Sequence, residues 1–258
     1  MRPLVMGVLN VTPDSFSDGG EWFEADAAVA RGLEMAEEGA DVVDVGGESS
    51  RPGADPVPQE EELRRVVPVV AALAPRVRVS IDTVKPAVAR AAVEAGATLI
   101  NDISGTLASV AAQAGVGWVA MHMRGDPKTM QSLAAYDDVV GEVCARLAEL
   151  VAGAEAAGIE EVWVDPGLGF AKTAAHNLAL LASLDRLAAL GRPVLVGASR
   201  KSFLGPLSAR AGEDPAPVDD RAEASLAAAV WAMDRGAAMV RVHDVAATLQ
   251  AAALVGEG

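Results

Sequence analysis

The sequence predicts a (β/α)₈ barrel, or TIM barrel, built as a single domain over residues 1–258. Two observations predict this fold. Eight short β-rich apolar runs alternate with eight longer stretches of helical period, and the alternation never lapses. No linker rich in proline and glycine divides the chain, and eight strand–helix units within about 250 residues match such a barrel. An open, doubly wound sheet is the alternative fold.

The predicted elements follow one another in strand–helix pairs from the N-terminus. The strands are expected at 4–9, 41–45, 77–81, 98–102, 118–121, 162–164, 193–196 and 239–242. The helices are expected at 23–39, 58–74, 85–96, 107–115, 137–158, 175–190, 219–236 and 245–254. Helix ends are marked by Gly39, Gly96, Gly115, Gly158, Gly191 and Gly236. Each stands just before the next strand. The residue that follows the end of a helix often adopts the left-handed backbone conformation, which favours glycine.

The chain is acidic, with a formal net charge of -15 and a mean hydropathy of +0.26. Charges interrupt every long apolar run, so no segment reaches the roughly 20 residues that a membrane helix needs. The negative charge argues against nucleic acid as a partner, because phosphates require a basic footprint, but it does not exclude a small anionic substrate. The single cysteine, Cys144, cannot form an internal disulfide, and no signal-peptide pattern opens the sequence. We therefore expect a soluble cytoplasmic protein.

The segment 6–20 is the first candidate for binding. An apolar run suited to a buried strand stops at Asn10 and becomes a polar loop with no periodicity of its own. Its oxygen-bearing side chains are those of Asn10, Thr12, Asp14, Ser15, Ser17 and Asp18. A plain connection needs only a few turn residues, so this loop is predicted to bind a ligand.

Polar clusters also follow the other seven predicted strands. They are the segments 44–53, 80–83, 101–103, 121–125, 165–172, 197–202 and 241–244. The first of them combines glycines, hydroxyls and a guanidinium, which suits a phosphate. The connections that lead into the strands, such as 95–97 and 191–193, carry little chemistry. This asymmetry predicts an active site at the mouth formed by the C-terminal ends of the strands.

Asp82, Asn101 and Asp165 each end a different predicted strand, so a barrel would bring them together. Two carboxylates and an amide suit a flat heterocycle with an edge of N–H donors, because a carboxylate accepts two such bonds in its own plane. Phe170 lies in a polar, glycine-rich loop, where its ring is expected to wall the pocket. The alternative is that each acid caps the helix that follows it.

Cations gather at the ends of the last two predicted strands. Arg200 and Lys201 are expected to open the helix after strand seven, where two positive charges are unfavourable unless an anion or an electron-rich ring is bound there. The alternative is a solvated pair on the surface. Arg241 and His243 alternate along strand eight and point to one face, so that with Arg51 they can hold a diphosphate. His243 alone is equally compatible with a structural role.

A zinc site is not expected, because neither His122 nor His176 has a second histidine or cysteine at zinc-ligand spacing, and both are interpreted as structural. The expected metal is Mg²⁺, which takes few protein oxygens and completes its shell with water and substrate phosphates. Asn10 is its predicted ligand, and Asp14 and Asp18 are expected to assist through water.

Together these loops resemble the dihydropteroate synthase family, the folate-pathway enzymes that sulfonamides inhibit. The matching segments are 6–20, 46–53, 80–83, 101–103, 121–125, 165–170, 199–202 and 241–243. They occur in the family's order and span the whole chain. The resemblance implies a (β/α)₈ barrel that condenses (7,8-dihydropterin-6-yl)methyl diphosphate with 4-aminobenzoate, giving dihydropteroate and diphosphate with Mg²⁺. It also implies a homodimer with two mobile loops that close over the substrates.

The resemblance further implies a role for each matching position. The pterin would be held by Asp82, Asn101, Asp165 and Lys201. The diphosphate would be held by Ser50, Arg51, Arg241 and His243. The 4-aminobenzoate site would be bordered by Pro52, Phe170, Arg200 and Ser202, and Mg²⁺ would be bound by Asn10. The residues expected to take part in the chemistry are Arg51, Lys201, Arg241 and His243.

One position departs from the family pattern. Ser50 stands where the family commonly has threonine, so the hydroxyl is kept and altered packing is expected rather than lost activity. Two alternative functions remain. A methyltetrahydrofolate–corrinoid methyltransferase would share the Asp/Asn/Asp pocket but would not use the phosphate loops of Asn10 and Arg51. A non-catalytic pterin-binding paralogue is the second alternative, and the intact loops count against it.

Overall fold

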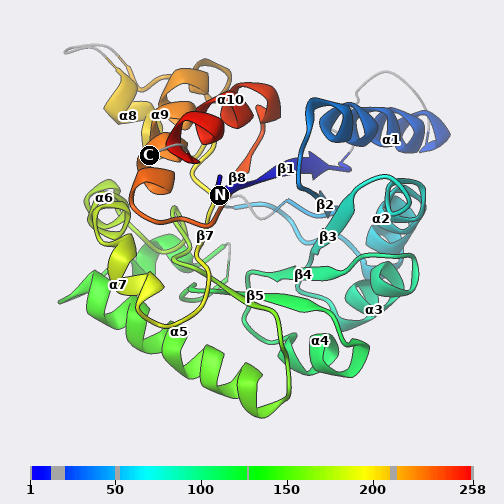
Figure 1. Ribbon diagram of the computed structural model, residues 1–258, viewed down its shortest axis with the longest axis horizontal. Coiled ribbons are helices and arrows are strands. Elements are labelled where there is room, and N and C mark those ends of the chain that lie inside the picture. Colours follow the sequence, from blue (N-terminus) through cyan, green and yellow to red (C-terminus); the bar gives the residue numbers. More distant parts are fainter. Residues whose placement is uncertain (1, 13–20, 50–52, 127, 210–213, 257–258) are drawn as a thin grey trace.

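The computed structural model of the chain describes residues 2–12, 21–49, 53–126, 128–209 and 214–256. Some residues of the predicted sites lie outside these described residues. They are Asp14, Ser15, Ser17, Asp18, Ser50, Arg51 and Pro52. The remaining candidate residues lie on or just after the strands at the centre of the molecule, and helices surround these strands in chain order (Figure 1).

The central sheet consists of parallel strands in the order β6-β5-β4-β3-β2-β1-β8-β7. Their bounds are β1 (Leu4–Asn10), β2 (Val42–Gly46), β3 (Arg78–Asp82), β4 (Leu99–Asp102), β5 (Gly117–Met121), β6 (Val162–Asp165), β7 (Leu195–Val196) and β8 (Met239–Val242). A parallel bridge between Val164 and Val194 joins the two ends of the sheet. The sheet is therefore a nearly closed barrel, and the prediction of a (β/α)₈ fold over an open doubly wound sheet is confirmed.

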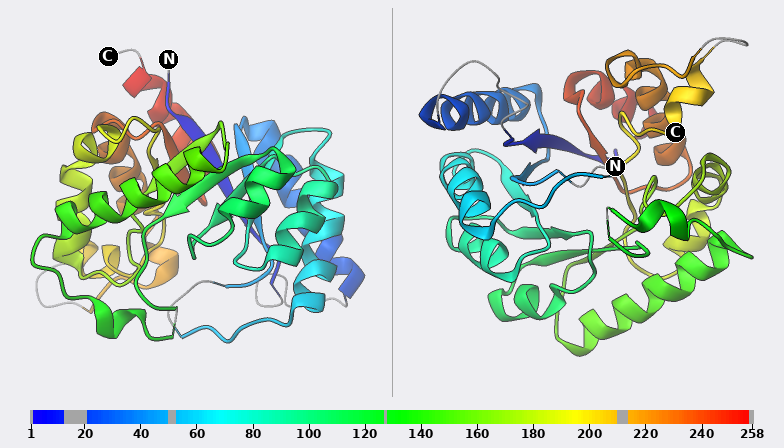
Figure 2. Two further views of the ribbon diagram at one scale, coloured as in Figure 1. Left: turned by 90° about the horizontal axis from the view of Figure 1, so that it is seen from below. Right: turned by 180° about the vertical axis from the view of Figure 1, so that it is seen from behind.

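The helices form the outer layer, which Figure 2 shows from two further directions. Their bounds are α1 (Glu21–Glu38), α2 (Gln59–Leu73), α3 (Pro86–Glu94), α4 (Ala108–Ala114), α5 (Val139–Ala156), α6 (Ala174–Ala182), α7 (Leu184–Ala188), α8 (Leu204–Ser208), α9 (Ala222–Asp234) and α10 (Val245–Gly256). Short 3₁₀ turns, η2 (Met130–Leu133) and η3 (Val218–Asp220), precede α5 and α9. The six predicted helix-ending glycines all have positive φ, between 65° and 117°, as expected.

The main differences from the prediction are four. The helix expected at 175–190 is two helices, α6 and α7, because Ser183 between them leaves helical geometry at φ -122° and ψ 29°. Strand β7 contains only Leu195–Val196 instead of 193–196. The helix expected at 219–236 begins at Ala222, and the short helix α8 was not expected at all.

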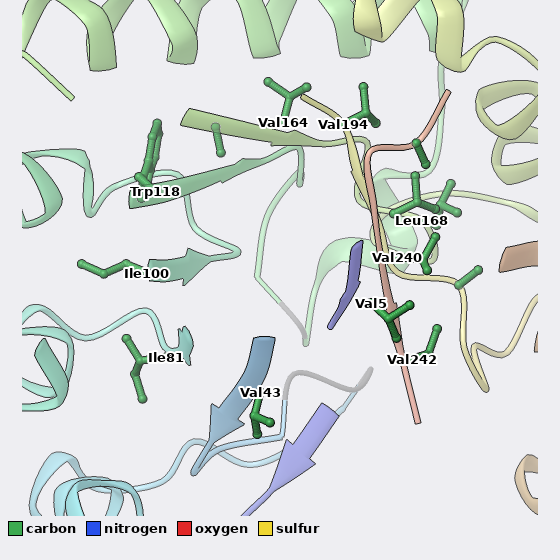
Figure 3. Packing of buried hydrophobic residues seen from close by; sticks show 14 of the residues in the cluster. Val5, Val43, Ile81, Ile100, Trp118, Val164, Leu168, Val194, Val240 and Val242 are labelled. Carbon is green, nitrogen blue, oxygen red and sulfur yellow. The ribbon is translucent and has the colours of Figure 1, made fainter. Parts of the chain in front are cut away.

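The main hydrophobic core lies between the barrel and its helices (Figure 3). Side chains that point outward from successive strands, such as those of Val43, Ile81, Ile100 and Trp118, pack there with no or almost no exposed surface. At about 25 cal/mol per Å² of apolar surface removed from water, this layer is the main stabilising contribution. No helix in the described part of the chain is long and apolar enough to cross a membrane.

The barrel interior changes from apolar to polar along the direction of the strands. A second cluster of buried residues, which we call the apolar floor, fills the lower interior; its buried members are Met6, Val42, Leu99, Val119, Trp163, Leu195 and Met239. Side chains on a strand repeat on one face every two residues, so the next inward positions are Asp44, Asn101, Asp165 and Arg241. Polar groups therefore begin one layer above the apolar floor, towards the C-terminal mouth.

Candidate active site

Arg241 is the centre of the polar layer. Its Nε donates to Oδ2 of Asp44 at 2.6 Å, and its Nη2 donates to Oδ2 of Asp82 at 2.8 Å. Asn101 donates from Nδ2 to the same Asp44 oxygen at 2.9 Å. These bonds connect β2, β3, β4 and β8 across the barrel interior. The predicted meeting of Asp82 with Asn101 is borne out by the register, in which the two residues are partners on β3 and β4.

The charges in this layer interact strongly. Burial raises the pKa of Asp82 to about 7; the Arg241 charge lowers it, and Asp44 raises it further. Burial also opposes the charge of Arg241, but the carboxylates of Asp44 and Asp82 outweigh it, so that the pKa of Arg241 lies above its usual value. The Oδ1 oxygen of Asp44 is buried and has no hydrogen-bond partner in the described part of the chain. The layer is therefore charged, desolvated and held by one guanidinium.

Asp165, at the end of β6, and Lys201, in the turn after β7, are a second charged group at the barrel mouth. Lys201 donates from Nζ to the carbonyl of Leu168, and the same nitrogen lies 4.6 Å from the centroid of the Phe170 ring. Burial lowers the pKa of Lys201 to about 8, against the opposing charge of Asp165. Burial raises the pKa of Asp165, and Lys201 lowers it. Lys201 also interacts electrostatically with Arg241 and Asp82. The charges of the Lys201–Asp165 group and of the Arg241 layer are therefore coupled.

The expectation that Arg200 and Lys201 open the helix after strand seven was wrong. Arg200 and Lys201 do not open a helix, because they lie in a turn after β7 and α8 begins only at Leu204. A helix dipole therefore does not act on them. Lys201 instead donates to the Leu168 carbonyl, lies over the Phe170 ring and is attracted by the charge of Asp165. Arg200 has a positive φ of 59°, and its side chain lies exposed at the rim, as does that of Ser202.

The turn that contains Arg200 is fastened to the start of α9. The backbone N–H of Arg200 donates to Oγ of Ser225 at 2.9 Å, and Arg221 donates from Nη1 to the carbonyl of Arg200 at 3.1 Å. A non-glycine residue in the left-handed region costs on the order of 1 kcal/mol or more, so these bonds stabilise a strained conformation. Neither Ser225 nor Arg221 was predicted from the sequence.

His243 lies directly after β8, on the same line of alternate residues as Arg241, as predicted. Its Nδ1 is 2.9 Å from Oγ of Ser199, and its backbone N–H donates to that oxygen at 3.2 Å. His243 is thus held against the end of β7. The sequence reasoning noticed Ser199 only as part of a motif.

Asn10 is the last residue of β1, paired with Gly46, and it is partly exposed at the mouth. No group of three or more histidine, cysteine, aspartate or glutamate side chains gathers around a metal site in the described residues. A single carboxamide at a charged mouth fits a cation that takes its other ligands from water and from a phosphate-bearing substrate. Asn10 therefore remains a candidate for holding Mg²⁺.

A cavity of about 230 Å³ opens beside Asp82 and extends towards the loops after β2 to β5. Glu48 and Glu62 line this cavity, and both form ion pairs with the ammonium of Lys85. The distance from Lys85 Nζ to Glu48 Oε2 is 2.6 Å. Glu62 is 1% exposed and also accepts from the hydroxyl of Thr83 at 2.6 Å. This cluster ties the second loop to the third. Glu62 was not predicted, because in the sequence it is one of several acids at the start of a helix.

Lys172 is a buried cation that the sequence analysis did not single out. It donates to the carbonyls of Phe170 at 2.9 Å, Gly167 at 3.0 Å and His122 at 3.3 Å, and its Nζ lies 3.0 Å from Nδ1 of His122. Burial lowers the pKa of Lys172 to about 7 and that of His122 to about 3. Lys172 fastens the loop after β6 to the loop after β5. The interpretation of His122 as structural agrees with these contacts, and His176 caps α6.

Asp44 is the most important residue that the sequence reasoning missed. It is completely buried and contacts both Arg241 and Asn101. The signal was present, because an aspartate interrupts the apolar strand 42–46 at an inward position. The structure thus places every described candidate at or beyond the C-terminal ends of the strands, at one mouth of the barrel: Asn10, Asp82, Asn101, Asp165, Phe170, Arg200, Lys201, Ser202, Arg241 and His243.

Comparisons with known proteins give one consistent result. Residues 6–243 match the family described as "Pterin binding enzyme". The chain is 49% identical to a dihydropteroate synthase of Mycobacterium leprae, over 98% of this chain and 92% of that protein. A structure of Xanthomonas albilineans dihydropteroate synthase with 4-aminobenzoic acid has a TM-score of 0.90 and 49% identity, and covers 99% of this chain and 93% of that one. A second structure of that enzyme, in complex with 7,8-dihydropteroate, has a TM-score of 0.87 and 46% identity, over 99% and 93% of the two chains.

Proposed function

The chain belongs to the family of pterin-binding enzymes and, within it, to the dihydropteroate synthases, and on this premise we propose how its residues divide the reaction. The reaction condenses (7,8-dihydropterin-6-yl)methyl diphosphate with 4-aminobenzoate to give 7,8-dihydropteroate and diphosphate. The observation that carries the proposal is the polar layer of Asp44, Asp82, Asn101 and Arg241 above the apolar floor, with Asp165 and Lys201 facing it.

The pterin ring lies on this layer. Asp165 and Asp82 accept N–H groups from the ring, and Asn101 supplies both a donor and an acceptor. Asp165 also accepts the backbone N–H of Gly167 at 2.7 Å, which fixes its carboxylate in place. Lys201, with its pKa lowered to about 8, donates to an acceptor on the ring and tunes its electron density. Burial makes each of these bonds stronger than it would be in water.

The chemistry needs no side-chain nucleophile. The bond between the pterin methylene carbon and the diphosphate oxygen breaks, and its electron pair leaves with the diphosphate. The nitrogen lone pair of 4-aminobenzoate forms the new C–N bond, and the amine loses one proton to solvent. Electron release from the pterin ring stabilises positive charge on the methylene carbon, so the protein has to neutralise the leaving group and position the amine.

Arg241 and His243 neutralise the diphosphate, together with Ser50 and Arg51, which lie outside the described residues. The contacts of Arg241 with the two aspartates use Nε and Nη2, and Nη1 has no partner among the described residues. That group is the one available to a phosphate oxygen. Mg²⁺ held by Asn10 would supply further positive charge to the leaving group. Phe170, Arg200, Ser202 and Pro52 border the site of 4-aminobenzoate, whose carboxylate suits the exposed guanidinium of Arg200.

A homodimer in the cytoplasm belongs to the same proposal. Both properties are implied by the family resemblance, and the absence of a membrane-spanning helix from the described residues is compatible with them. Size-exclusion chromatography with light scattering gives the oligomeric state directly. A monomer would contradict this part of the proposal and leave the assignment of the site unchanged.

The deciding experiment is a coupled assay of diphosphate release from the pterin diphosphate, with and without 4-aminobenzoate and Mg²⁺. Release that depends on both supports the proposal. A requirement for a corrinoid would indicate a methyltransferase instead, and pterin binding without release would indicate a non-catalytic paralogue. In the same assay Arg241→Ala should lower kcat by about 10² or more, the usual cost of removing one such donor. A wild-type rate would reject the role of Arg241.

A further inference from the structure

We propose that Asn177 is a positioning residue for the reaction. It holds the peptide group between Leu168 and Gly169 in the orientation in which the carbonyl of that group binds the ammonium of Lys201. The inference rests on the proposed function, in which Lys201 donates to the pterin ring. Asn177 lies on α6, and its side chain is completely buried. It was not among the residues predicted from the sequence.

The peptide group between Leu168 and Gly169 is hydrogen-bonded on both of its edges. Its carbonyl accepts from Nζ of Lys201, and its N–H donates to Oδ1 of Asn177 at 2.9 Å. A backbone N–H can only donate, so the carboxamide atom that faces it is the oxygen. The peptide bond is planar and trans, so its C=O and N–H point in opposite directions. The bond to Asn177 therefore sets the direction of the carbonyl that binds Lys201.

Gly169 makes this peptide group easy to rotate. Its φ is +82°, and glycine leaves the adjoining peptide group more freedom than any other residue does. The aliphatic stem of Lys201 lies against it, because a Cβ at Gly169 would be 3.2 Å from Cδ of Lys201. A rotation would therefore move both the carbonyl that binds the ammonium and the surface on which the stem packs.

The two ends of the same turn are held by other residues. Lys172 donates to the carbonyls of Gly167 and Phe170 at 3.0 and 2.9 Å. The N–H of Gly167 donates to Asp165 at 2.7 Å. These bonds do not involve Asn177. Its loss should therefore free the central peptide group and leave the turn formed.

The carboxamide of Asn177 contributes little net stability. It is 0% exposed, and its Nδ2 has no hydrogen-bond partner in the described part of the chain. A buried donor without a partner is destabilising, and this offsets the gain from the bond that the oxygen accepts. An apolar side chain of similar shape would avoid that cost. What the asparagine provides is the direction of one peptide group.

The ammonium of Lys201 needs this carbonyl because it is desolvated. Burial lowers its pKa to about 8; the charge of Asp165 raises the pKa, that of Arg241 lowers it and that of Asp82 raises it. A hydrogen bond to the charged form favours that form. Loss of the oriented carbonyl should therefore lower the pKa of Lys201 further. A general loosening of the site would instead admit water and raise the pKa towards its usual value.

The first test reads Lys201 in the absence of substrate. Labelling of lysine Cε with ¹³C gives signals from Lys85, Lys128, Lys172 and Lys201, and Lys201→Met assigns the last of them. Asn177→Leu keeps the branched shape of the side chain but has no acceptor. A pH titration should show a lower pKa for Lys201 in this variant than in the wild-type protein. An unchanged or raised pKa would overturn the proposal.

Diphosphate release gives a second readout. Asn177→Leu should lower kcat/KM for the pterin diphosphate by about tenfold or more, because a hydrogen bond to a charged group is misplaced. In a Lys201→Met background the same substitution should change kcat/KM by less than about twofold, since residues that act through one another are not additive. An effect of equal size in both backgrounds would refute the role of Asn177.

Further variants separate positioning from stability. Asn177→Asp keeps an oxygen acceptor and should retain most of the wild-type kcat/KM. Thr173→Ala removes the hydroxyl that accepts from the N–H of His176 and caps α6. This matched control should lower Tm but leave the pKa of Lys201 and kcat/KM unchanged. If Asn177→Leu does not fold, Asn177→Ala carries the same expectations without added volume.

The outcomes also separate the inference from the function on which it rests. A wild-type protein that releases no diphosphate would refute the proposed function, and the titration of Lys201 would still decide whether Asn177 orients its carbonyl partner. A Lys201→Met variant with the wild-type kcat/KM would refute the role of Lys201 in the reaction, and the inference with it.

Discussion

Replacing Asp44 with asparagine tests the electrostatics of the polar layer with almost no change of shape. The variant keeps an oxygen that accepts from Arg241 and Asn101 in the position of Oδ2, where the wild-type distances are 2.6 and 2.9 Å. Its amide nitrogen occupies the position of Oδ1, which has no partner among the described residues. The change therefore removes one buried negative charge and adds one unpaired donor.

The expected loss of stability follows from this environment. Asp44 is completely buried, so solvent does not screen its attraction to Arg241. Removing one partner of a buried ion pair costs about 3–5 kcal/mol, and the lower end applies here because Asp82 still holds the guanidinium. At roughly 2–4 °C per kcal/mol for a chain of this length, Tm should fall by about 6–12 °C.

The same variant should alter the pH dependence of the enzyme. The Asp44 charge helps to raise the pKa of Asp82, so Asp44→Asn should lower that pKa from its value of about 7. Asp82 must be ionised to accept an N–H of the pterin, and activity is lost as the pH falls through its pKa. The acid limb of kcat/KM for the pterin substrate should therefore move to lower pH in the variant.

Thermal unfolding and a pH profile of diphosphate release measure the two effects. Asp41→Asn is the matched control on the same stretch of chain, because Asp41 pairs with Arg2 at 2.6 Å in a partly exposed position. Such a pair contributes about 0–1 kcal/mol, and this variant should not move the acid limb. An acid limb that stays in place or moves upward in Asp44→Asn would refute the coupling between Asp44 and Asp82.

Three further predictions concern the loops and the metal. Gly167→Ala would place a Cβ 2.0 Å from the carbonyl oxygen of His122 at a φ of +67°, so urea unfolding should show a loss of more than about 1 kcal/mol, whereas Gly153→Ala in open space on α5 should gain about 0.5–1 kcal/mol. Lys172→Met should lose about 3 kcal/mol or more, because buried carbonyls are left without a donor, and should raise the KM for 4-aminobenzoate; an unchanged KM would contradict the role of Lys172 in shaping that loop. Chelation of Mg²⁺ should stop diphosphate release, and Asn10→Ala should raise the Mg²⁺ concentration needed for half-maximal rate; full activity in a chelator would disprove the metal requirement.

The raised pKa of Asp82 also sets a pH dependence of folding stability. Because this pKa rises from 3.8 to about 7, the folded chain keeps the proton over a range in which the unfolded chain has released it. The contribution of the group to stability is therefore complete below pH about 4 and is lost as the pH rises through about 7. Asp82→Asn should remove this slope from a plot of unfolding free energy against pH, and a slope that persists would assign it to another group.

The strand pattern predicted the site well because the chemistry of a barrel is concentrated at known positions. Asp82, Asn101 and Asp165 stand at strand ends, and a parallel barrel brings such ends to one mouth whatever their separation in sequence. The two-residue period of a strand also placed Arg241 and His243 on one face. These arguments need only local patterns and one rule about the fold.

The residues that were missed depend on contacts that no local pattern reveals. Asp44 looks like a member of a glycine-rich loop until its neighbours on the barrel interior are known. Lys172 follows a turn and reads as a surface residue, yet it is 4% exposed because three backbone carbonyls turn inward around it. Glu62 is one of several acids in the first turn of α2, and only the packing of that helix selects it for burial.

The short seventh strand makes the barrel unequal around its circumference. Between β6 and β7 the backbone is joined by one isolated bridge, Val164 to Val194, together with a 3.0 Å bond from the N–H of Val164 to the carbonyl of Pro193. We call this weakly joined contact between β6 and β7 the seam. Asp165, at the end of β6, and Lys201, after β7, lie on its two sides and attract each other electrostatically. A pterin that contacts both residues would link β6 to β7. The bound ligand would then stabilise the barrel at the place where few backbone hydrogen bonds do so. Amide hydrogens along the seam should then exchange more slowly in the liganded enzyme than in the free one.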